Sequence, residues 1–125
     1  MENLKFLVKR VKDYKPFKAV DGSDVVEVIG MKTTKTKEVS IAYATVKPKQ
    51  KTILHKHDFT EVYIILKGKG IIYLNNESRP ISKDDNILIP AKTWHQVENT
   101  GKTNLKIICI CVPAFSERKT NLKKF

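Results

Sequence analysis

The sequence predicts an all-β protein with a closed or two-sheet architecture. Its apolar residues come in short runs bounded by Gly, Pro, Asn, Asp or Lys pairs, which is typical of many short strands. No segment keeps a convincing helical period over about three turns. Two runs, residues 62–66 and 107–112, are apolar on both faces. We therefore expect those two strands to lie between two layers rather than against water.

The expected strands follow one another along the chain with short turns between them. They are residues 4–8, 25–29, 39–46, 62–66, 70–74, 86–89, 94–98 and 105–112. Gly and Asn accept the positive φ angles of tight connections, and the strongest turn signals lie at residues 21–23, 67–70, 75–76 and 99–101. A short charged helix over residues 116–125, after Pro113, is the one peripheral exception that we consider.

The length of 125 residues falls in the usual range of about 100 to 200 residues for one domain, and we expect a single domain over residues 1–125. No run of about 18 apolar residues predicts a membrane span. Residues 1–20 lack the apolar stretch of a secretion signal. Cys109 and Cys111 are the only cysteines and, as neighbours on one strand face, are poorly placed to bond to each other. We expect a reduced, cytoplasmic protein.

The chain is basic, with 24 Lys and Arg against 13 Asp and Glu. Such a charge could indicate RNA, a membrane surface or a phosphorylated metabolite as partner. The positive residues are nearly all Lys and are scattered without a dense block, and no interleaved aromatic and Arg pattern is present. We interpret the charge as a solvated surface and expect neither a nucleic-acid nor a membrane partner.

All three histidines lie in two short segments, residues 54–57 and 90–95. On a strand, His55 and His57 project to one face about 6.6 to 6.8 Å apart, so both can reach one ion at about 2.0 to 2.1 Å. Glu61 has the same parity. It joins that face if the strand continues, and the fold must bring it back if a turn intervenes at residues 58–59. His95 can point into the same interior from an adjacent strand.

The spacing of these residues resembles that of a known family. The pair His55 and His57, followed by Glu61 and Gly68, resembles the first motif of the cupin family. Pro90, His95 and Asn99 resemble the second motif, after a spacer of about fifteen residues at 69–83. The resemblance implies a double-stranded β-helix, a jelly roll, with one divalent metal ion inside the barrel. Its implied ligands are His55, His57, Glu61 and His95.

The resemblance covers about residues 16–120, and its flanks look like small prokaryotic cupins labelled as resembling mannose-6-phosphate isomerase. Three positions where the motifs usually have Gly depart from the pattern, namely Lys49, Asp84 and Lys92. All three are turn positions, so they affect loop shape rather than metal binding.

Other residues have both a structural and a functional interpretation. Tyr63 shares the parity of Glu61 and is either a packed core residue or a proton donor in the cavity. Cys109 and Cys111 act as small hydrophobes or line the pocket. We expect Asn99 to hydrogen-bond the turn that follows it, and Trp94 to lie in the core or at a dimer interface.

A site of three His and one Glu suits Fe, Mn, Ni, Zn or Cu and leaves coordination positions for an oxygen ligand. We expect a metalloenzyme that acts on an oxygen-rich small molecule, of the dioxygenase or the sugar or sugar-phosphate isomerase type. The alternative is a non-catalytic module that binds a metabolite or a metal. Small cupins resemble one another in often pairing as homodimers through sheet edges or an exchanged N-terminal strand, and Leu4, Phe6 and Val8 alternate as such a strand would. We therefore expect a homodimer.

Overall fold

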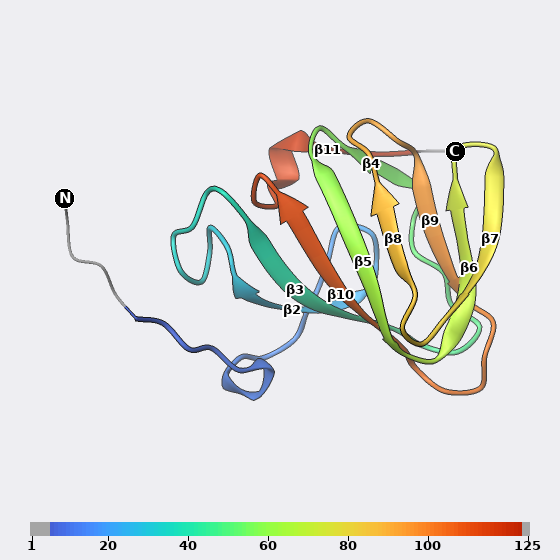
Figure 1. Cartoon of the computed structure of the whole chain (residues 1–125), viewed down its shortest axis with the longest axis horizontal. Helices are drawn as coiled ribbons and strands as arrows, with labels where there is room; N and C mark the ends of the chain where they lie inside the picture. Colours follow the sequence, from blue (N-terminus) through green and yellow to red (C-terminus); the bar gives the residue numbers. More distant parts are fainter. Residues whose placement is uncertain (1–5, 124–125) are drawn as a thin grey trace.

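The chain forms two antiparallel sheets that face each other as a double-stranded β-helix (Figure 1). The computed structural model describes residues 6–123. Within that range the helices are two short 3₁₀ turns, and no helix is long and apolar enough to cross a membrane. The elements are η1 (Val11–Asp13), β1 (Phe17–Lys18), β2 (Asp24–Ile29), β3 (Ser40–Val46), β4 (His55–His57), β5 (Thr60–Lys67), β6 (Lys69–Leu74), β7 (Glu77–Ser82), β8 (Asn86–Ile89), β9 (His95–Asn99), β10 (Leu105–Val112), η2 (Glu117–Lys119) and β11 (Thr120–Leu122).

The strand order shows how distant segments become neighbours. The first sheet has the order β1-β2-β3-β10-β5-β8, and the second has the order β11-β4-β9-β6-β7. The all-β prediction is confirmed, and strands β8 and β10 have the predicted bounds. That residues 1–125 form one domain stays a prediction.

Two predictions at the ends of the chain need correction. Residues 6–8 form no strand, and residues 4 and 5 of the expected strand lie outside the described residues. The expected helix at residues 116–125 is wrong over its described part, which forms η2 and β11. The reason is tertiary: β11 pairs with β4, so its backbone groups bond to another strand instead of within a helix.

Strand β7 was not predicted from the sequence. Five of its six residues are exposed, and it contains Pro80. It is the edge strand of its sheet, which is where a proline lacking an N–H group is tolerated.

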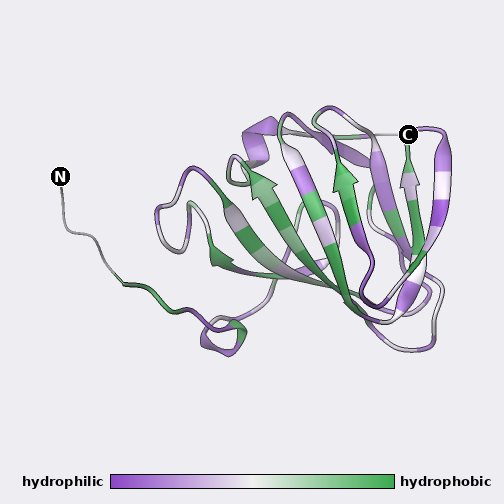
Figure 2. Cartoon of the chain, viewed as in Figure 1, coloured by the Kyte–Doolittle hydropathy of each residue, from purple (hydrophilic) through white to green (hydrophobic). Residues whose placement is uncertain are grey.

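The inner faces of the two sheets share one apolar core. The alternation along β5 buries Tyr63 and Ile65, and the facing strands contribute Ile72 and Val97. Figure 2 shows the hydrophobic segments concentrated on the central strands of the first sheet, with hydrophilic residues at the loops and along β7. The core therefore occupies one part of the barrel and leaves the rest for polar side chains.

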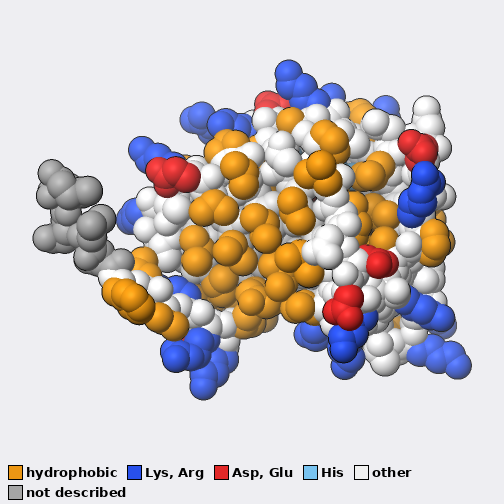
Figure 3. Space-filling model, in the orientation of Figure 1, with side chains coloured by type: hydrophobic (Ala, Val, Ile, Leu, Met, Phe, Trp, Pro, Cys, Tyr) orange, Lys and Arg blue, Asp and Glu red, His pale blue; other side chains and the backbone are white. Residues whose placement is uncertain are grey.

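The outer face of the first sheet is also apolar. We expected residues 62–66 and 107–112 to be covered on both faces, but no second layer covers their outer face in the described chain. Leu88 is 62% exposed, Val112 53% and Leu66 39%. Hydrophobic side chains cover the middle of this face, with Lys and Arg around its margin (Figure 3). The physical reason is that the second sheet covers only the inward set of alternating side chains.

Three turns adopt a backbone conformation that favours glycine. The φ angles of Lys49, Asp84 and Lys92 are 68°, 76° and 64°. These are the three positions where the resembled motifs usually have Gly. The three turns thus have a conformation that favours glycine although none of these residues is glycine, and each residue carries a strain of about 1 kcal/mol.

We expect Lys49→Gly and Lys92→Gly each to stabilise the protein by about 0.5 to 1 kcal/mol, because glycine relieves the strain at positive φ. Equilibrium unfolding in denaturant measures the change. Lys102→Gly, at an exposed position without positive φ, is the control and should be neutral or destabilising. Equal destabilisation by all three substitutions would contradict the turn interpretation.

Candidate metal centre

Three imidazoles meet on the inner face of the second sheet. His55 and His57 occupy alternate positions of β4, and the register pairs His55 with His95 at the start of β9. The ring centroid of His55 lies 4.9 Å from that of His57 and 4.1 Å from that of His95. The prediction that His95 joins the pair from an adjacent strand is confirmed.

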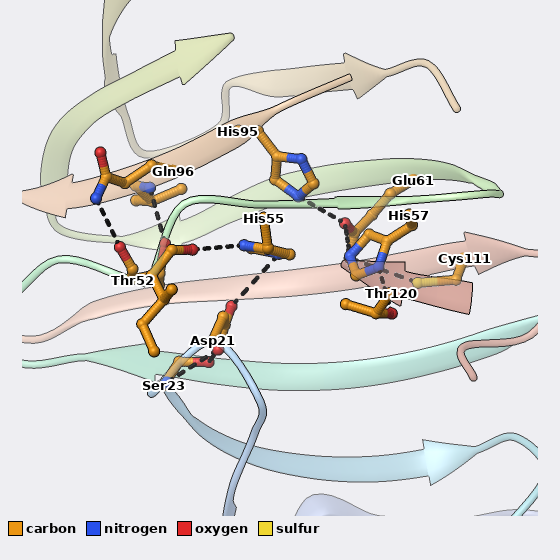
Figure 4. Close-up of polar contacts among 12 residues, drawn as sticks. Asp21, Ser23, Thr52, His55, His57, Glu61, His95, Gln96, Cys111 and Thr120 are labelled. Carbon is orange, nitrogen blue, oxygen red and sulfur yellow. Dashed lines mark hydrogen bonds and ion pairs between the residues drawn. The ribbon is translucent and has the colours of Figure 1, made fainter. Parts of the chain in front are cut away.

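Glu61 arrives from the opposite sheet. After His57 the chain bends at residues 58–59 and enters β5 of the first sheet, so of the two alternatives that the sequence left open, the fold brings Glu61 back. Its Oε1 atom lies 3.3 Å from His57 Nε2 and 3.3 Å from His95 Nε2 (Figure 4). Two sheets therefore supply one cluster.

The ring nitrogens are oriented by their other hydrogen bonds. His55 Nδ1 donates to the carbonyl of Ile53 at 2.7 Å, and His95 Nδ1 donates to the carbonyl of Thr93 at 2.9 Å, because a carbonyl oxygen can only accept.

His57 is oriented in the same way by the C-terminal segment. Its Nδ1 lies 2.8 Å from Thr120 Oγ1, and that hydroxyl donates its own hydrogen to the carbonyl of Ser116. Thr120 therefore accepts from His57. In all three rings Nδ1 is the donor, which leaves Nε2 with a free lone pair for a metal ion.

Two buried atoms in the cluster have no hydrogen-bond partner, Glu61 Oε1 and His95 Nε2. An unpaired buried carboxylate oxygen costs several kcal/mol, so an acceptor pair of this kind calls for a cation. The candidate ligand atoms of His55, His57, Glu61 and His95 all lie within 4.8 Å of one another. Nitrogen and oxygen donors in this arrangement fit one divalent ion.

The Glu61 carboxyl is ionised and held through its second oxygen. Burial raises its pKa, whereas hydrogen bonds from His57 and His95, which would require a proton on Nε2, lower the pKa to about 2. A cation held between Oε1 and the Nε2 atoms would take the place of those protons. Cys111 Sγ donates to Glu61 Oε2 at 3.4 Å. Because burial and the Glu61 charge raise the pKa of Cys111, the sulfur stays a thiol and can act as a donor. Only Oε1 is then free for a metal ion.

The cluster is shielded from water. The exposed fraction of the four residues is at most 5%. The Phe59 ring stacks on His57 at 4.4 Å between centroids, and Phe115 contacts both rings edge-on. This environment strengthens electrostatic interactions inside the barrel.

The burial of His55 has a consequence for its charge. Desolvation, followed by the nearby His95, lowers the pKa of His55 to about 4. The ring is therefore neutral at pH 7, which is the form that binds metals.

The remaining sequence candidates separate into interior and exterior positions. Tyr63 is buried 6.1 Å from the His95 ring, and desolvation and the Glu61 charge raise its pKa, so its hydroxyl keeps its proton. Cys109 and Cys111 are free thiols on the same strand face as Leu105 and Ile107 of the core.

Asn99 and Trp94 lie outside the cluster. Asn99 has the predicted structural role, since its amide bonds Val46 and Thr103 and accepts from Gly101. Trp94 lies beneath the ammonium group of Lys56, at 4.9 Å from the ring centroid. Because Lys56 alternates with the inward histidines, Trp94 is on the outer side of the second sheet and not in the core.

Sequence reasoning missed Asp21. We expected only a turn at residues 21–23, yet Asp21 Oδ2 lies 3.8 Å from His55 Nε2. The signal in the sequence is an ordinary Asp-Gly-Ser turn, and nothing in it indicates that the turn reaches the barrel interior.

Comparisons with known proteins agree with this geometry. A model of the cupin domain matches residues 42–111. The uncharacterized protein MJ1618 of Methanocaldococcus jannaschii is 37% identical over 98% of both chains. The oxalate-binding protein of Thermotoga maritima is 35% identical over 47% of this chain and 50% of its own length.

The fold has solved relatives as well. The crystal structure of a predicted oxalate decarboxylase from Thermotoga maritima is similar with a TM-score of 0.75 and 24% identity, over 86% of this chain and 99% of the other. At that identity the likeness concerns the fold.

We expect the stability of the metal-free protein to fall as the pH drops from about 6.5 to 4. In that window the unfolded chain binds a proton at His55 that the folded chain excludes, which amounts to on the order of 3 kcal/mol. Unfolding in urea with a chelator present, at a series of pH values, measures the slope. His55→Gln should have a shallower slope than the wild type, and equal slopes would show that His55 is not buried as a neutral ring.

Proposed function

Because the chain belongs to the cupin family, we propose that His55, His57, Glu61 and His95 hold one divalent metal ion, at which a small oxygen-rich molecule binds and is activated. The observation that carries this proposal is the pair of unpaired buried atoms, Glu61 Oε1 and His95 Nε2, which face each other at 3.3 Å. A chain that needed no cation here would gain stability from apolar side chains of similar size.

Metal chemistry at such a site consists of polarising a bound oxygen ligand or carrying dioxygen, and Fe, Mn, Ni, Zn and Cu all suit the donor set. The protein residues contribute orientation and exclusion of water. Cys111 restricts Glu61 to one ligating oxygen, which leaves coordination positions open to a ligand. The low exposure of the four ligands supports a small ligand.

Tyr63 is our candidate proton donor. It is buried beside His95 and keeps its hydroxyl proton, as a general acid requires. With this residue in place we propose an enzyme of the dioxygenase or the sugar or sugar-phosphate isomerase type.

The second candidate function is a binding module without turnover. The name of the oxalate-binding relative supports it. A cytoplasmic setting belongs to both proposals, and the two free thiols support it.

We expect the protein purified without a His tag to contain about one equivalent of metal, and Glu61→Gln, His57→Ala and His95→Ala each to lose most of it, because each variant removes one of the four buried ligand atoms. Elemental mass spectrometry measures the content. Glu98→Gln removes a carboxylate that bonds Tyr73 instead and should retain the metal. Wild-type protein without metal after reconstitution with each ion would contradict the proposal.

The same preparations separate enzyme from binding module. Turnover of oxygen-rich substrates that depends on the metal and falls at least tenfold in Tyr63→Phe, with the metal content unchanged, supports the enzyme. A ligand-induced rise in melting temperature without turnover supports the binding module.

We further propose that two copies of the chain form a homodimer through the outer face of the first sheet. The register aligns Ile110 with Val62 and with Ile41, and Val62 with Leu88, in one apolar row across four strands. The basic residues that this view shows, on a chain with net charge +11, lie mostly around the apolar patch (Figure 3), and Lys106 lies at its margin, near the start of β10. Like charges would therefore be kept apart when two such faces meet.

A second copy, rather than a different protein, fits because the chain offers two unpartnered apolar features together. Residues 6–8 run clear of the sheets (Figure 1), and Phe6 is 95% exposed. In a dimer each arm can cover apolar surface of the other copy, as the alternation of Phe6 and Val8 predicts.

We expect the metal-loaded protein to sediment at twice its monomer mass of 14.3 kDa. Leu88→Lys and Val112→Lys together should give monomers, because two ammonium groups cannot be buried between apolar faces. Ile53→Lys, which places the same charge at an exposed apolar residue just before β4, should leave the mass unchanged. A wild-type monomer at micromolar concentration would refute the dimer.

A further inference from the structure

The turn between β1 and β2 brings a second carboxylate to the edge of the candidate metal centre. The turn is closed by the bonds Gly22 N to Ala19 O and Ala19 N to Ser23 O, with Gly22 at a φ of 91°. A hydrogen bond of 2.7 Å from Ile53 N to Asp21 O fixes the turn to the segment that precedes β4. This bond places Asp21 beside Ile53, two residues before the ligand His55.

One oxygen of Asp21 is used by the turn and the other is not. Ser23 donates to Asp21 Oδ1 through its backbone N–H at 3.0 Å and through its hydroxyl at 2.7 Å. Oδ2 points instead at His55 Nε2, 3.8 Å away (Figure 4). The side chain is 14% exposed, so this orientation is built by the turn and is not a free rotamer of a surface residue.

The contact between Asp21 and His55 joins two electron-rich atoms. His55 Nδ1 donates to Ile53 O, so Nε2 of the neutral ring carries a lone pair, and the carboxylate can only accept. Asp21 does not belong to the four residues whose ligand atoms cluster within 4.8 Å. It therefore lies beside the coordination shell, next to His55, where it would contact a ligand bound on that side of the ion.

We propose that Asp21 determines which oxygen ligand the metal centre accepts: it receives a hydrogen bond from a ligand hydroxyl and repels a second ligand carboxylate. The inference rests on the proposed metal site. Glu61 and Asp21 together balance the charge of a divalent ion, so a hydroxy acid adds one negative charge to a neutral centre while a dicarboxylate adds two. In a buried site that difference is large, because the charges are weakly screened.

The ligand class that follows is a small α-hydroxy acid or another hydroxyl-bearing chelate, in preference to a dicarboxylate. Glycolate and oxalate are matched probes, since they differ in one carboxylate that is replaced by a hydroxymethyl group. The relative from Thermotoga maritima is named for oxalate. In this chain, Asp21 is the residue that would discriminate between glycolate and oxalate.

The experiment compares the dissociation constants of glycolate and oxalate by calorimetry on the manganese-loaded full chain. Asp21→Asn and Asp21→Ala should shift the preference toward oxalate by about tenfold or more. Asp24→Asn removes the same charge from a carboxylate that pairs with Lys18 at 2.8 Å, and should leave the ratio of the two constants unchanged.

Manganese content, measured on each preparation by elemental mass spectrometry, separates the two levels of the proposal. Wild-type protein that takes up no metal overturns the metal site and this inference with it. If the loaded wild type and both Asp21 variants show the same preference between glycolate and oxalate, the role of Asp21 is overturned while the metal site stands. The same conclusion follows if the Asp21 variants fail to bind oxalate.

Discussion

The crossing of the chain from one sheet to the other at residues 58–59 is the constraint on which the centre depends. It places β4 and β5 on opposite walls of the barrel, so His57 and Glu61 face each other across the interior. A continuous strand would have put both on one wall. Because the ligands come from both walls, an ion between them would tie the two sheets together, and its loss would leave a buried carboxylate unpaired.

The polar groups behind the cluster fix the orientation of its imidazole rings. Backbone carbonyls of Ile53 and Thr93 fix the tautomers of His55 and His95, and the C-terminal segment fixes His57 through Thr120. Strand β11 thus has two roles, since it extends the second sheet and also orients a ligand. The metal centre consequently depends on residues far beyond the two motifs that define its ligands.

The two faces of the first sheet differ in their surroundings. Its inner face carries Glu61, Tyr63 and Cys111 toward the centre, while its outer face is apolar and exposed at Leu88 and Val112. The sequence showed apolar residues on both faces and predicted two covering layers. One chain supplies only one layer, and the second copy that we propose would cover the other face.

The sequence by itself determined the all-β class, the approximate positions of seven strands and the four candidate ligands, because alternation and motif spacing are local properties that a chain displays before it folds. The tertiary structure alone decided that Glu61 returns from the other sheet, that residues 120–122 form a strand beside His57, and that Asp21 reaches the centre. Each of these depends on hydrogen bonds between segments distant in the chain, such as Ile53 to Asp21. No local pattern encodes such pairing, since it arises only when the sheets close around a common interior.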